Sequence, residues 1–211
     1  MARISIVKLS EIKGVKRFDA GRYRTSFLKL ERDLKKITII SKLGYLVEEP
    51  IRKGHTPRNR DIYQNDIRIH FIKTDNLREG VIDFENSDFL PVRSLSDGDY
   101  LKFKNIMVTI RGAHYDIIGR AAIFLDYYPQ SVTNQNIAVI KTDENLLNPF
   151  YLTIFLNSKY GKEQLWMLSR QTEQFNLNCR EVEELLIPLF DADFQQEIET
   201  LAKNSFDLIE K

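Results

Sequence analysis

Cysteine and histidine are scarce in this sequence. Cys179 is the single cysteine, and the three histidines, His55, His70 and His114, are never four residues apart. A disulfide needs two cysteines, and a structural zinc site needs several thiolate or imidazole ligands. The sequence therefore predicts no intrachain disulfide and no metal site, and it is typical of a protein from a reducing, cytoplasmic compartment.

Long apolar runs are lacking too. No stretch approaches the roughly 18 consecutive apolar residues of a membrane-spanning helix. The N-terminal residues MARISIVKLSEIKG have only a short, interrupted apolar run and no small-residue cleavage site, so we expect no secretory signal. Nine glycines and six prolines in 211 residues exclude a collagen-like or low-complexity chain. This length suits one large domain or two small ones with a real core.

The sequence also lacks the common catalytic motifs. It contains no phosphate-binding G-x-x-x-x-G-K-[ST], no G-x-G-x-x-G and no G-x-S-x-G. Residues 148–151, NPFY, are similar to the Asn-Pro-Pro-Tyr loop of adenine methyltransferases, but they lack its second proline, and a helix cap followed by a first-turn proline explains them. Asp19, Asp33 and Lys35 fit a loose nuclease pattern, but they fall on the polar face of a predicted helix, where such residues are expected. We predict no catalytic residue, which favours a binding module.

The near-neutral total hides an uneven distribution of charge. Residues 171–211 contain ten acidic and three basic residues, a formal charge of −7, so residues 1–170 carry +8 within the total of +1. In the basic part, residues 51–60 read IRKGHTPRNR and gather four Arg or Lys residues around a Gly and a Pro. A basic body with an acidic tail suits a polyanion partner on the body and a protein partner on the tail, but two solvated surfaces explain the charge equally well.

Periodicity predicts helices at both ends of the chain and strands between them. Residues 18–36 place Tyr23, Phe27, Leu30 and Leu34 on one helical face. From Ile67 the period changes to two, and short strands are predicted at residues 67–72, 81–90, 99–104, 105–112, 117–126 and 133–143. Such short strands favour a compact, mostly antiparallel sheet or barrel-like body.

The C-terminal part is predicted to be helical. Asn148 and Pro149 predict the cap and first turn of a buried helix, and residues 161–171 predict a second helix. Asn178 and Glu181 resemble a capping box that opens a short helix, which Pro188 ends. Residues 191–211 predict an amphipathic helix whose apolar stripe is formed by Phe194, Ile198, Leu201 and Leu208. This stripe packs either on a partner or on the chain's own body, and the pattern does not decide between the two.

A series of short motifs resembles one protein family in its order. The motifs are Gly54-His55-Thr56-Pro57, residues 67–77 (IRIHFIKTDNL), Gly80-Val81-Ile82, Gly98-Asp99-Tyr100-Leu101, Arg111-Gly112, Ile118-Gly119-Arg120-Ala121, residues 133–136 (TNQN), residues 175–178 (FNLN), residues 186–189 (LIPL) and residues 195–198 (QQEI). Together they resemble the target-recognition domain of type I restriction–modification specificity subunits.

The resemblance has two departures. Leu189-Phe190 stands where the family usually has a second proline, and one recognition unit is present where a complete specificity subunit has two in tandem. Residues 17–20 (RFDA) with Tyr23 resemble the start of recognition segments in fused methyltransferase–specificity proteins. A half-length subunit, one arm of a split system and an excised domain are all compatible with this.

The resemblance implies a fold and a task. The fold is α+β. A β core with helices, like that of a target-recognition domain, covers residues 1–190 and includes a helical lead-in at 18–36. Residues 191–211 form the start of a C-terminal spacer helix. That helix packs against its counterpart from a second recognition half or a second copy. The task is to read one half of a bipartite site in double-stranded DNA without catalysis. Partner methyltransferase subunits carry S-adenosylmethionine, a type I restriction subunit uses ATP and Mg, and this chain needs no cofactor.

The residues that contact DNA are predicted in two groups. Phosphate contacts position such a domain, and contacts to base edges specify the sequence. The predicted phosphate-contacting residues are Arg52, Lys53, Gly54 (through its backbone), Thr56, Arg58 and Arg60. The predicted base readers are Asn76, Arg111, His114, Asn134, Gln135, Arg170 and Gln171, because guanidinium groups pair with guanine and amides pair with adenine.

Structural roles compete with several of these assignments. The amides at residues 134–136 also suit backbone hydrogen bonds at the start of a strand, Arg120 suits an internal salt bridge, and His114 with Tyr115 suits a turn. Two other functions stay open: the recognition domain of a larger fused methyltransferase–endonuclease, and a protein-interaction adaptor without DNA binding.

Overall fold

The computed structural model describes residues 23–37, 39–58, 60–114, 116–171 and 175–209, together with Ile6 and Lys8. The predicted motif at residues 17–20, the start of the predicted helix 18–36 and Tyr115 lie outside these residues. The same is true of the side chains of Arg170 and Gln171.

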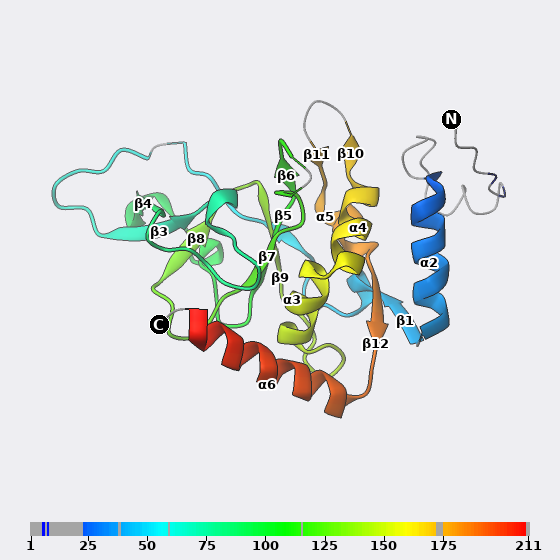
Figure 1. The fold of residues 1–211 in the computed structure, drawn as a ribbon. Coiled ribbons are helices and arrows are strands. Elements are labelled where there is room, and N and C mark those ends of the chain that lie inside the picture. Colours follow the sequence, from blue (N-terminus) through cyan, green and yellow to red (C-terminus); the bar gives the residue numbers. More distant parts are fainter. Residues whose placement is uncertain are drawn as a thin grey trace.

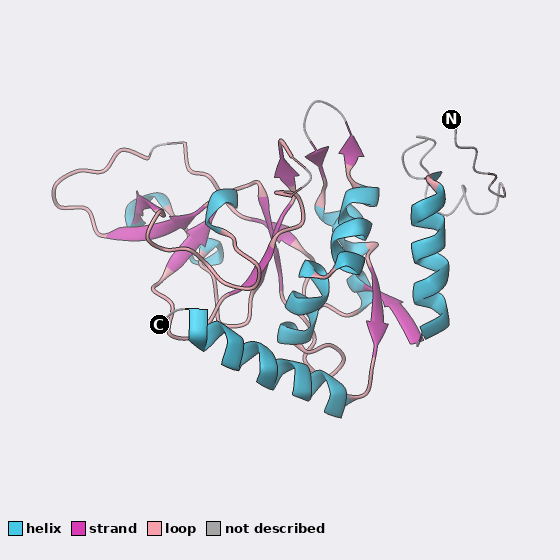
Figure 2. Ribbon diagram, viewed as in Figure 1, coloured by secondary structure: helices cyan, strands magenta, loops and turns pink. Residues whose placement is uncertain are grey.

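Short strands and helices are joined by many loops (Figure 2). The strands are β1 (Ile39–Lys42), β2 (Arg52–Lys53), β3 (Arg68–Ile72), β4 (Asp88–Pro91), β5 (Ile106–Thr109), β6 (Arg111–Gly112), β7 (Ala121–Ile123), β8 (Ser131–Thr133), β9 (Ile137–Ile140), β10 (Arg170–Gln171), β11 (Phe175–Asn176) and β12 (Leu186–Leu189). The α-helices are α2 (Thr25–Ile37), α3 (Pro149–Asn157), α4 (Lys159–Leu168), α5 (Cys179–Glu183) and α6 (Ala192–Ile209), and 3₁₀ helices cover Leu43–Tyr45, Thr74–Asn76, Val92–Ser94 and Asp97–Asp99. The predicted α+β class with a β core is confirmed.

The central sheet has the strand order β2-β9-β5-β7, and its neighbouring strands are antiparallel (Figure 1). Every residue of β5, β7 and β9 is buried. Side chains alternate between two cores: Ile106 and Val108 pack with residues of α3 and α4, whereas Met107 packs in a second core on the other face. Because both faces are covered, the residues of these strands are apolar apart from the buried Thr109 and do not alternate with polar residues.

A second sheet, β4-β3-β8, flanks the central one. The period of two after Ile67 correctly predicts β3, where Ile69 and Phe71 are buried in a small core with Leu90 and Val132. β3 pairs antiparallel with β4 but parallel with β8, so the sheet is not wholly antiparallel.

The strand predicted at residues 99–104 is wrong. Residues 97–99 form a 3₁₀ turn in which Ser96 and Asp99 cap each other reciprocally. The side chain of Asn105 then accepts a hydrogen bond from the Lys102 N–H at 2.9 Å. Such local bonds offer the backbone an alternative to strand pairing.

The predicted helix caps are confirmed. The Asn148 side chain accepts hydrogen bonds from the N–H groups of Phe150 and Tyr151 at the start of α3, where Pro149 occupies the first turn. Asn178 and Glu181 form a reciprocal capping box at α5. The NPFY segment therefore has a structural role, as its cap pattern predicts.

Pro188 does not end a helix, contrary to the prediction. α5 ends at Glu183, and Pro188 lies within β12, opposite Ile40 of β1. Among the described strands β12 pairs only with β1, and such an edge strand tolerates a residue without an N–H. The buried Gln164 of α4 both accepts from the Leu186 N–H (2.8 Å) and donates to its carbonyl (3.0 Å), which fixes the start of β12.

α6 packs along the body through a face that is partly polar. Gln195, Glu199, Ala202 and Phe206 are buried on this inner face. Gln195 accepts a hydrogen bond from the Asn148 N–H at 2.9 Å, and Asn148 donates through its side chain to Glu199. The amphipathic helix predicted over 191–211 is confirmed as far as Ile209, and it folds back on its own chain.

The predicted partner stripe is divided by this packing. Ile198 packs against the body's own core, which corrects its assignment to an outward stripe. Phe194, Leu201 and Leu208 are 39%, 58% and 75% exposed, and their spacing of seven residues keeps them on one side of the helix. α6 therefore packs on its own body and still presents an apolar outer stripe.

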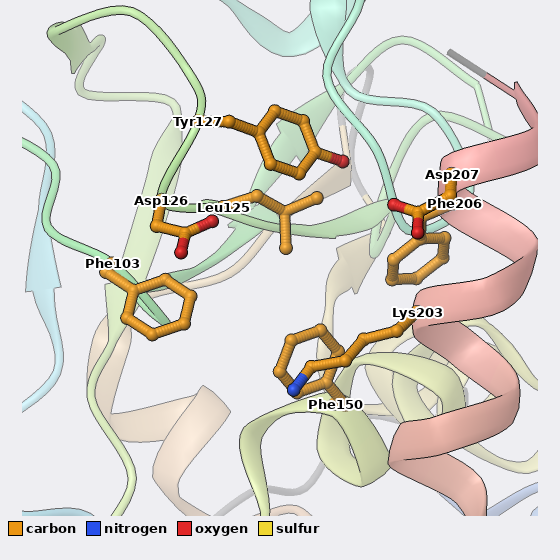
Figure 3. A pocket seen from close by; sticks show the side chains of 8 residues that line it. All are labelled: Phe103, Leu125, Asp126, Tyr127, Phe150, Lys203, Phe206 and Asp207. Carbon is orange, nitrogen blue, oxygen red and sulfur yellow. The ribbon is translucent and has the colours of Figure 1, made fainter. Parts of the chain in front are cut away.

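A pocket of about 150 Å³ lies between the C-terminal half of α6 and the loop after β7 (Figure 3). In it, the Lys203 ammonium lies 4.9 Å from the centre of the Phe150 ring, and Phe150 stacks with Phe206. Phe206 also covers Gly80, where φ is +102° and an added Cβ would lie 2.4 Å from the ring, so the contact requires glycine. The pocket marks the seam along which α6 joins the body.

No described helix is long and apolar enough to cross a membrane. The described residues also contain no group of three or more His, Cys, Asp or Glu side chains placed to hold a metal ion.

Candidate nucleic-acid interface

The basic loop after β2 is fixed to the start of β9. The Gly54 N–H donates to the Ile137 carbonyl at 3.0 Å, and the Thr56 hydroxyl accepts from the Gln135 N–H at 3.4 Å. A Cβ on Gly54 would lie 2.3 Å from the Thr133 carbonyl oxygen, so glycine is required here by an internal contact. The prediction that the Gly54 backbone donates to a phosphate is corrected, because its N–H is already used within the fold.

Arg52 and Lys53 lie on opposite faces of the central sheet, as consecutive strand residues must. Arg52 is half-buried and donates to the Tyr100 carbonyl at 3.3 Å. Lys53 is exposed on the side of Cys179. Burial raises the pKa of the Cys179 thiol, and the positive charge of Lys53 opposes this shift. The two side chains therefore have different surroundings, and Arg52 already has a structural partner.

Arg58 and Arg60 lie further along the same loop, and both are exposed. With Lys53, they are the predicted phosphate-contacting cations whose side chains are exposed. The long loop that carries them extends away from the central sheet towards β3 (Figure 1).

A small sheet, β10-β11-β6, brings together residues that are distant in the sequence. Arg170 pairs with Asn176, and Asn176 pairs with Arg111, so the three positions form one row across the sheet. Arg111 and Asn176 are exposed, whereas Phe175 in the neighbouring row packs against the core. The outward row therefore combines guanidinium and amide groups, which are the groups that read base edges.

The small sheet and the basic loop belong to one continuous surface. The Ile110 N–H donates to the Asn136 carbonyl (2.9 Å), and the Leu177 N–H donates to the Ile110 carbonyl (2.8 Å). Gly54 bonds to Ile137 at the start of β9, so the basic loop lies beside the turn that precedes β9. That turn lies beside Ile110, which precedes β6, and Ile110 lies beside Leu177, which follows β11. We call this surface the recognition edge, and we define it by Lys53, Arg58, Arg60, Arg111, Gln135 and Asn176.

Two predicted base readers are buried and serve the fold. Asn76 is 2% exposed; its side chain accepts from the Lys73 N–H (2.8 Å) and donates to the Asp83 carbonyl (3.1 Å). Asn134 is 8% exposed and accepts from the Asn136 N–H at 3.0 Å. The assignment of Asn76 to a base edge is corrected, because both polar atoms of its side chain bond to the backbone. The Asn134 oxygen also bonds to the backbone, as its competing structural role predicts, and its assignment as a reader stays a prediction.

The competing structural roles of two further residues are confirmed. Arg120 pairs with Asp116 at 3.3 Å and also donates to its carbonyl. The His114 carbonyl accepts from the N–H groups of Ile117 and Ile118, so this residue shapes a turn. The His114 side chain is exposed beside β6 and stays a candidate reader.

Sequence reasoning missed Asn176 and Arg93. Asn176 lies in a quoted motif, but the register that places it between two arginines depends on β6, a strand more than 60 residues earlier in the chain. Arg93 contacts the basic loop from a segment 27 residues beyond Asp66, its bonding partner. Neither role leaves a local sequence signal.

Comparisons with solved structures agree on the fold. A chain from work on the complex assembly and conformational transition of the type I R-M system matches with a TM-score of 0.58 and 13% identity, over 96% of this chain and 49% of that one. The HsdS subunit from Thermoanaerobacter tengcongensis matches with a TM-score of 0.55 and 13% identity, over 95% and 48%.

The chain has the fold of type I specificity subunits. The resemblance that the motifs predict is therefore confirmed at the level of the fold, and the chain spans about half the length of these structures. The type IIG restriction endonuclease BpuSI also matches, with a TM-score of 0.61 and 11% identity, over 93% of this chain and 30% of that one. No protein-family model and no curated protein match the sequence.

Proposed function

We propose that this chain is the DNA-recognition module of a restriction–modification system. It reads one half of a bipartite duplex site and directs partner methyltransferase and endonuclease subunits to it. The observation that carries this proposal is the recognition edge, a continuous surface of exposed cations and amides on the fold of type I specificity subunits. The same fold recurs in a type IIG restriction endonuclease.

Phosphate contacts come from the basic loop in this proposal. Arg58 and Arg60 are exposed, and Lys53 extends the positive charge towards α5. Cations that neutralise phosphates release condensed counterions, which makes affinity fall steeply with salt. These contacts set the register of the protein on the duplex and carry no sequence information.

Base reading falls to the exposed amide and guanidinium groups beside the loop. Arg111 and Asn176 lie in one row of the small sheet, and Gln135 lies in the turn before β9. Arginine pairs bidentately with guanine, and asparagine or glutamine pairs with adenine. Readers from a sheet edge and a turn reach adjacent base pairs when the loop holds the backbone.

The chemistry belongs to partner subunits in this proposal. A methyltransferase subunit carries S-adenosylmethionine, and a type I restriction subunit carries ATP and Mg, while this chain is not itself an enzyme. The outer stripe of α6, exposed at Leu201 and Leu208, binds a second recognition half or a second copy.

A second candidate is the recognition domain of a larger fused methyltransferase–endonuclease. The match to BpuSI, of which this chain covers 30%, favours it. Both candidates use the recognition edge in the same way, and the length of the gene product distinguishes them.

The test is a salt titration of binding to random-sequence duplex DNA. We expect the double substitution Arg58→Ala with Arg60→Ala to weaken binding at every sequence. If each residue neutralises one phosphate, the slope of log affinity against log salt becomes shallower by about 1.8. Lys29→Ala with Lys36→Ala is the matched control, because it removes two exposed charges from α2, on the far side of the body (Figure 1).

The proposal requires the two double variants to differ in the slope of log affinity against log salt. Equal slopes in both variants would contradict the assignment of the basic loop to phosphates. Absence of binding by the unaltered chain at low salt would leave the adaptor as the better description.

A further inference from the structure

The loop between β2 and β3 is long for a connection in a compact domain. It runs from Gly54 to Ile67, and it carries Arg58 and Arg60. Loops of this length without secondary structure are uncommon unless they have a function. Its first end is fixed at Gly54 and Thr56, as described above.

Its second end is bound to the 3₁₀ helix after β4, where the Val92 N–H donates to the Ile67 carbonyl at 2.9 Å and the Arg93 side chain contacts the loop. The guanidinium donates to both carboxylate oxygens of Asp66, at 2.9 and 3.2 Å, and to the Asp61 carbonyl at 2.8 Å. It also lies 4.9 Å from the centre of the Tyr63 ring. One residue thus contacts three positions of the loop, and only arginine combines a planar fork with stacking on an aromatic ring.

Asp66 completes this arrangement within the loop. Its carboxylate accepts from the Tyr63 N–H at 2.8 Å, and the Asp66 N–H donates to the Tyr63 carbonyl at 3.1 Å. The hydrogen bond from Arg93 is the main cause of a lowered Asp66 pKa, and the Tyr63 N–H adds to it. The turn at residues 63–66 is therefore closed on itself and bound to Arg93.

The two fixed ends enclose the stretch that bears both arginines. Arg58 and Arg60 are exposed between the contacts at Thr56 and those at Asp61. A loop that is already ordered before binding loses less conformational entropy when it meets a ligand. Holding both ends therefore favours binding without adding a contact to the ligand.

We propose that Arg93 is a positioning residue that orders the basic loop for DNA binding through Asp66, Asp61 and Tyr63. It acts through the loop and does not itself neutralise a phosphate. The inference rests on the proposed function, since the ligand of the loop is the DNA backbone.

Asp66→Ala gives the sharpest test, because the loss of its charge and the loss of its positioning role predict opposite changes in DNA affinity. Removing a negative charge from a DNA-binding surface strengthens binding on electrostatic grounds. If Asp66 orders the loop, removing its side chain weakens DNA binding by about tenfold, because the loop must then become ordered as it binds. We expect this weakening, measured as affinity for random duplex at several salt concentrations.

Variants of Arg93 separate positioning from direct contact. Arg93→Ala and Arg93→Lys are both expected to weaken binding by about tenfold with an unchanged salt slope, because lysine keeps the charge but lacks the fork. The double variant Arg93→Ala with Asp66→Ala should bind DNA no more weakly than either single variant, since the two single variants and the double variant break the same network of contacts. Stronger binding by Asp66→Ala, or unaltered binding by Arg93→Lys, would overturn the inference.

Trypsin reports the order of the loop without DNA. Cleavage after Arg58 and Arg60 requires local opening, so it should be several-fold faster in Asp66→Ala and Arg93→Lys than in the unaltered chain at equal thermal stability. Equal cleavage rates would also overturn the inference. If the unaltered chain binds no duplex while the variants are cleaved faster, the proposed function fails and the ordering by Arg93 stands.

Discussion

Amide side chains have two different uses in this protein. Asn157 of α3 accepts from the Ala121 N–H and donates to its carbonyl, and Gln164 of α4 does the same for Leu186. These amides satisfy buried backbone groups where helices meet strands. Gln135 and Asn176 are exposed on the recognition edge and are the amides available to a ligand.

Asn176→Ala should change sequence preference more than overall affinity. A bidentate amide–adenine pair discriminates against the wrong base by about 1–3 kcal/mol, so enrichment at one position of a selected site should fall by about tenfold. Selection from a randomised duplex pool measures this directly. The control is Asn204→Ala, an exposed amide on α6, which should leave the selected site unaltered. A uniform loss of affinity across all sites would assign Asn176 to positioning.

Local roles of residues could be predicted from the sequence, and long-range roles could not. The caps at Asn148 and Asn178 involve partners within three residues, so their spacing identifies them. The same residue type at positions 76 and 134 was assigned to DNA, yet both amides bond to nearby backbone. A loop amide that bonds to its own turn and a loop amide that faces solvent can have the same local sequence pattern.

At the scale of elements, α6 is docked by a polar network as much as by apolar contacts. Glu199 is 8% exposed and accepts hydrogen bonds from Asn148 and Lys203. Burial alone would raise the pKa of Glu199, but the bonds from Lys203 and Asn148 outweigh it, and the pKa is lowered. The docking of α6 is therefore linked to pH.

Glu199→Gln should destabilise the protein at neutral pH and much less in acid. Because the folded pKa lies below the ordinary 4.5, the carboxylate stabilises the fold above that pH, and this contribution is lost as the pH falls through the lowered folded value. Losing a hydrogen-bonded charge costs about 1–3 kcal/mol of unfolding free energy. Urea unfolding at pH 7 and pH 3.5 measures both values. The exposed Glu197→Gln is the control, and an equal loss at both pH values would contradict the linkage.

The elements themselves were predicted unevenly. α3, α6 and β3 have strong periodicity or caps, and the structure contains them near the predicted positions. β10, β11 and β12 have only two to four residues each, and β11 and β12 pair with the distant strands β6 and β1. Such strands take their structure from tertiary context, which explains why Pro188 was misassigned to a helix end.

At the scale of the whole molecule, the uneven charge of the sequence becomes a spatial separation. β6, β10 and β11 of the recognition edge lie at one end of the body, and α6 lies at the opposite end (Figure 1). The exposed residues of the edge include Lys53, Arg58, Arg60 and Arg111, whereas α6 carries four acidic residues and one basic residue. In the proposed function, this separation leaves α6 accessible to a partner while the recognition edge contacts DNA.

The outer stripe of α6 should control assembly without affecting DNA contacts. Leu201 and Leu208 are 58% and 75% exposed, and fully burying each against a partner contributes about 1.5–3 kcal/mol. Leu201→Ser with Leu208→Ser should therefore weaken self-association by about a hundredfold or more. Sedimentation velocity over a range of concentrations should show dimers of the unaltered chain where the variant is monomeric. Leu146→Ser, which alters another exposed leucine, should sediment like the unaltered chain. Identical assembly of the double variant and the unaltered chain would exclude the stripe as the partner surface, and a parallel loss of DNA affinity in the monomer would show that the two ends are not independent.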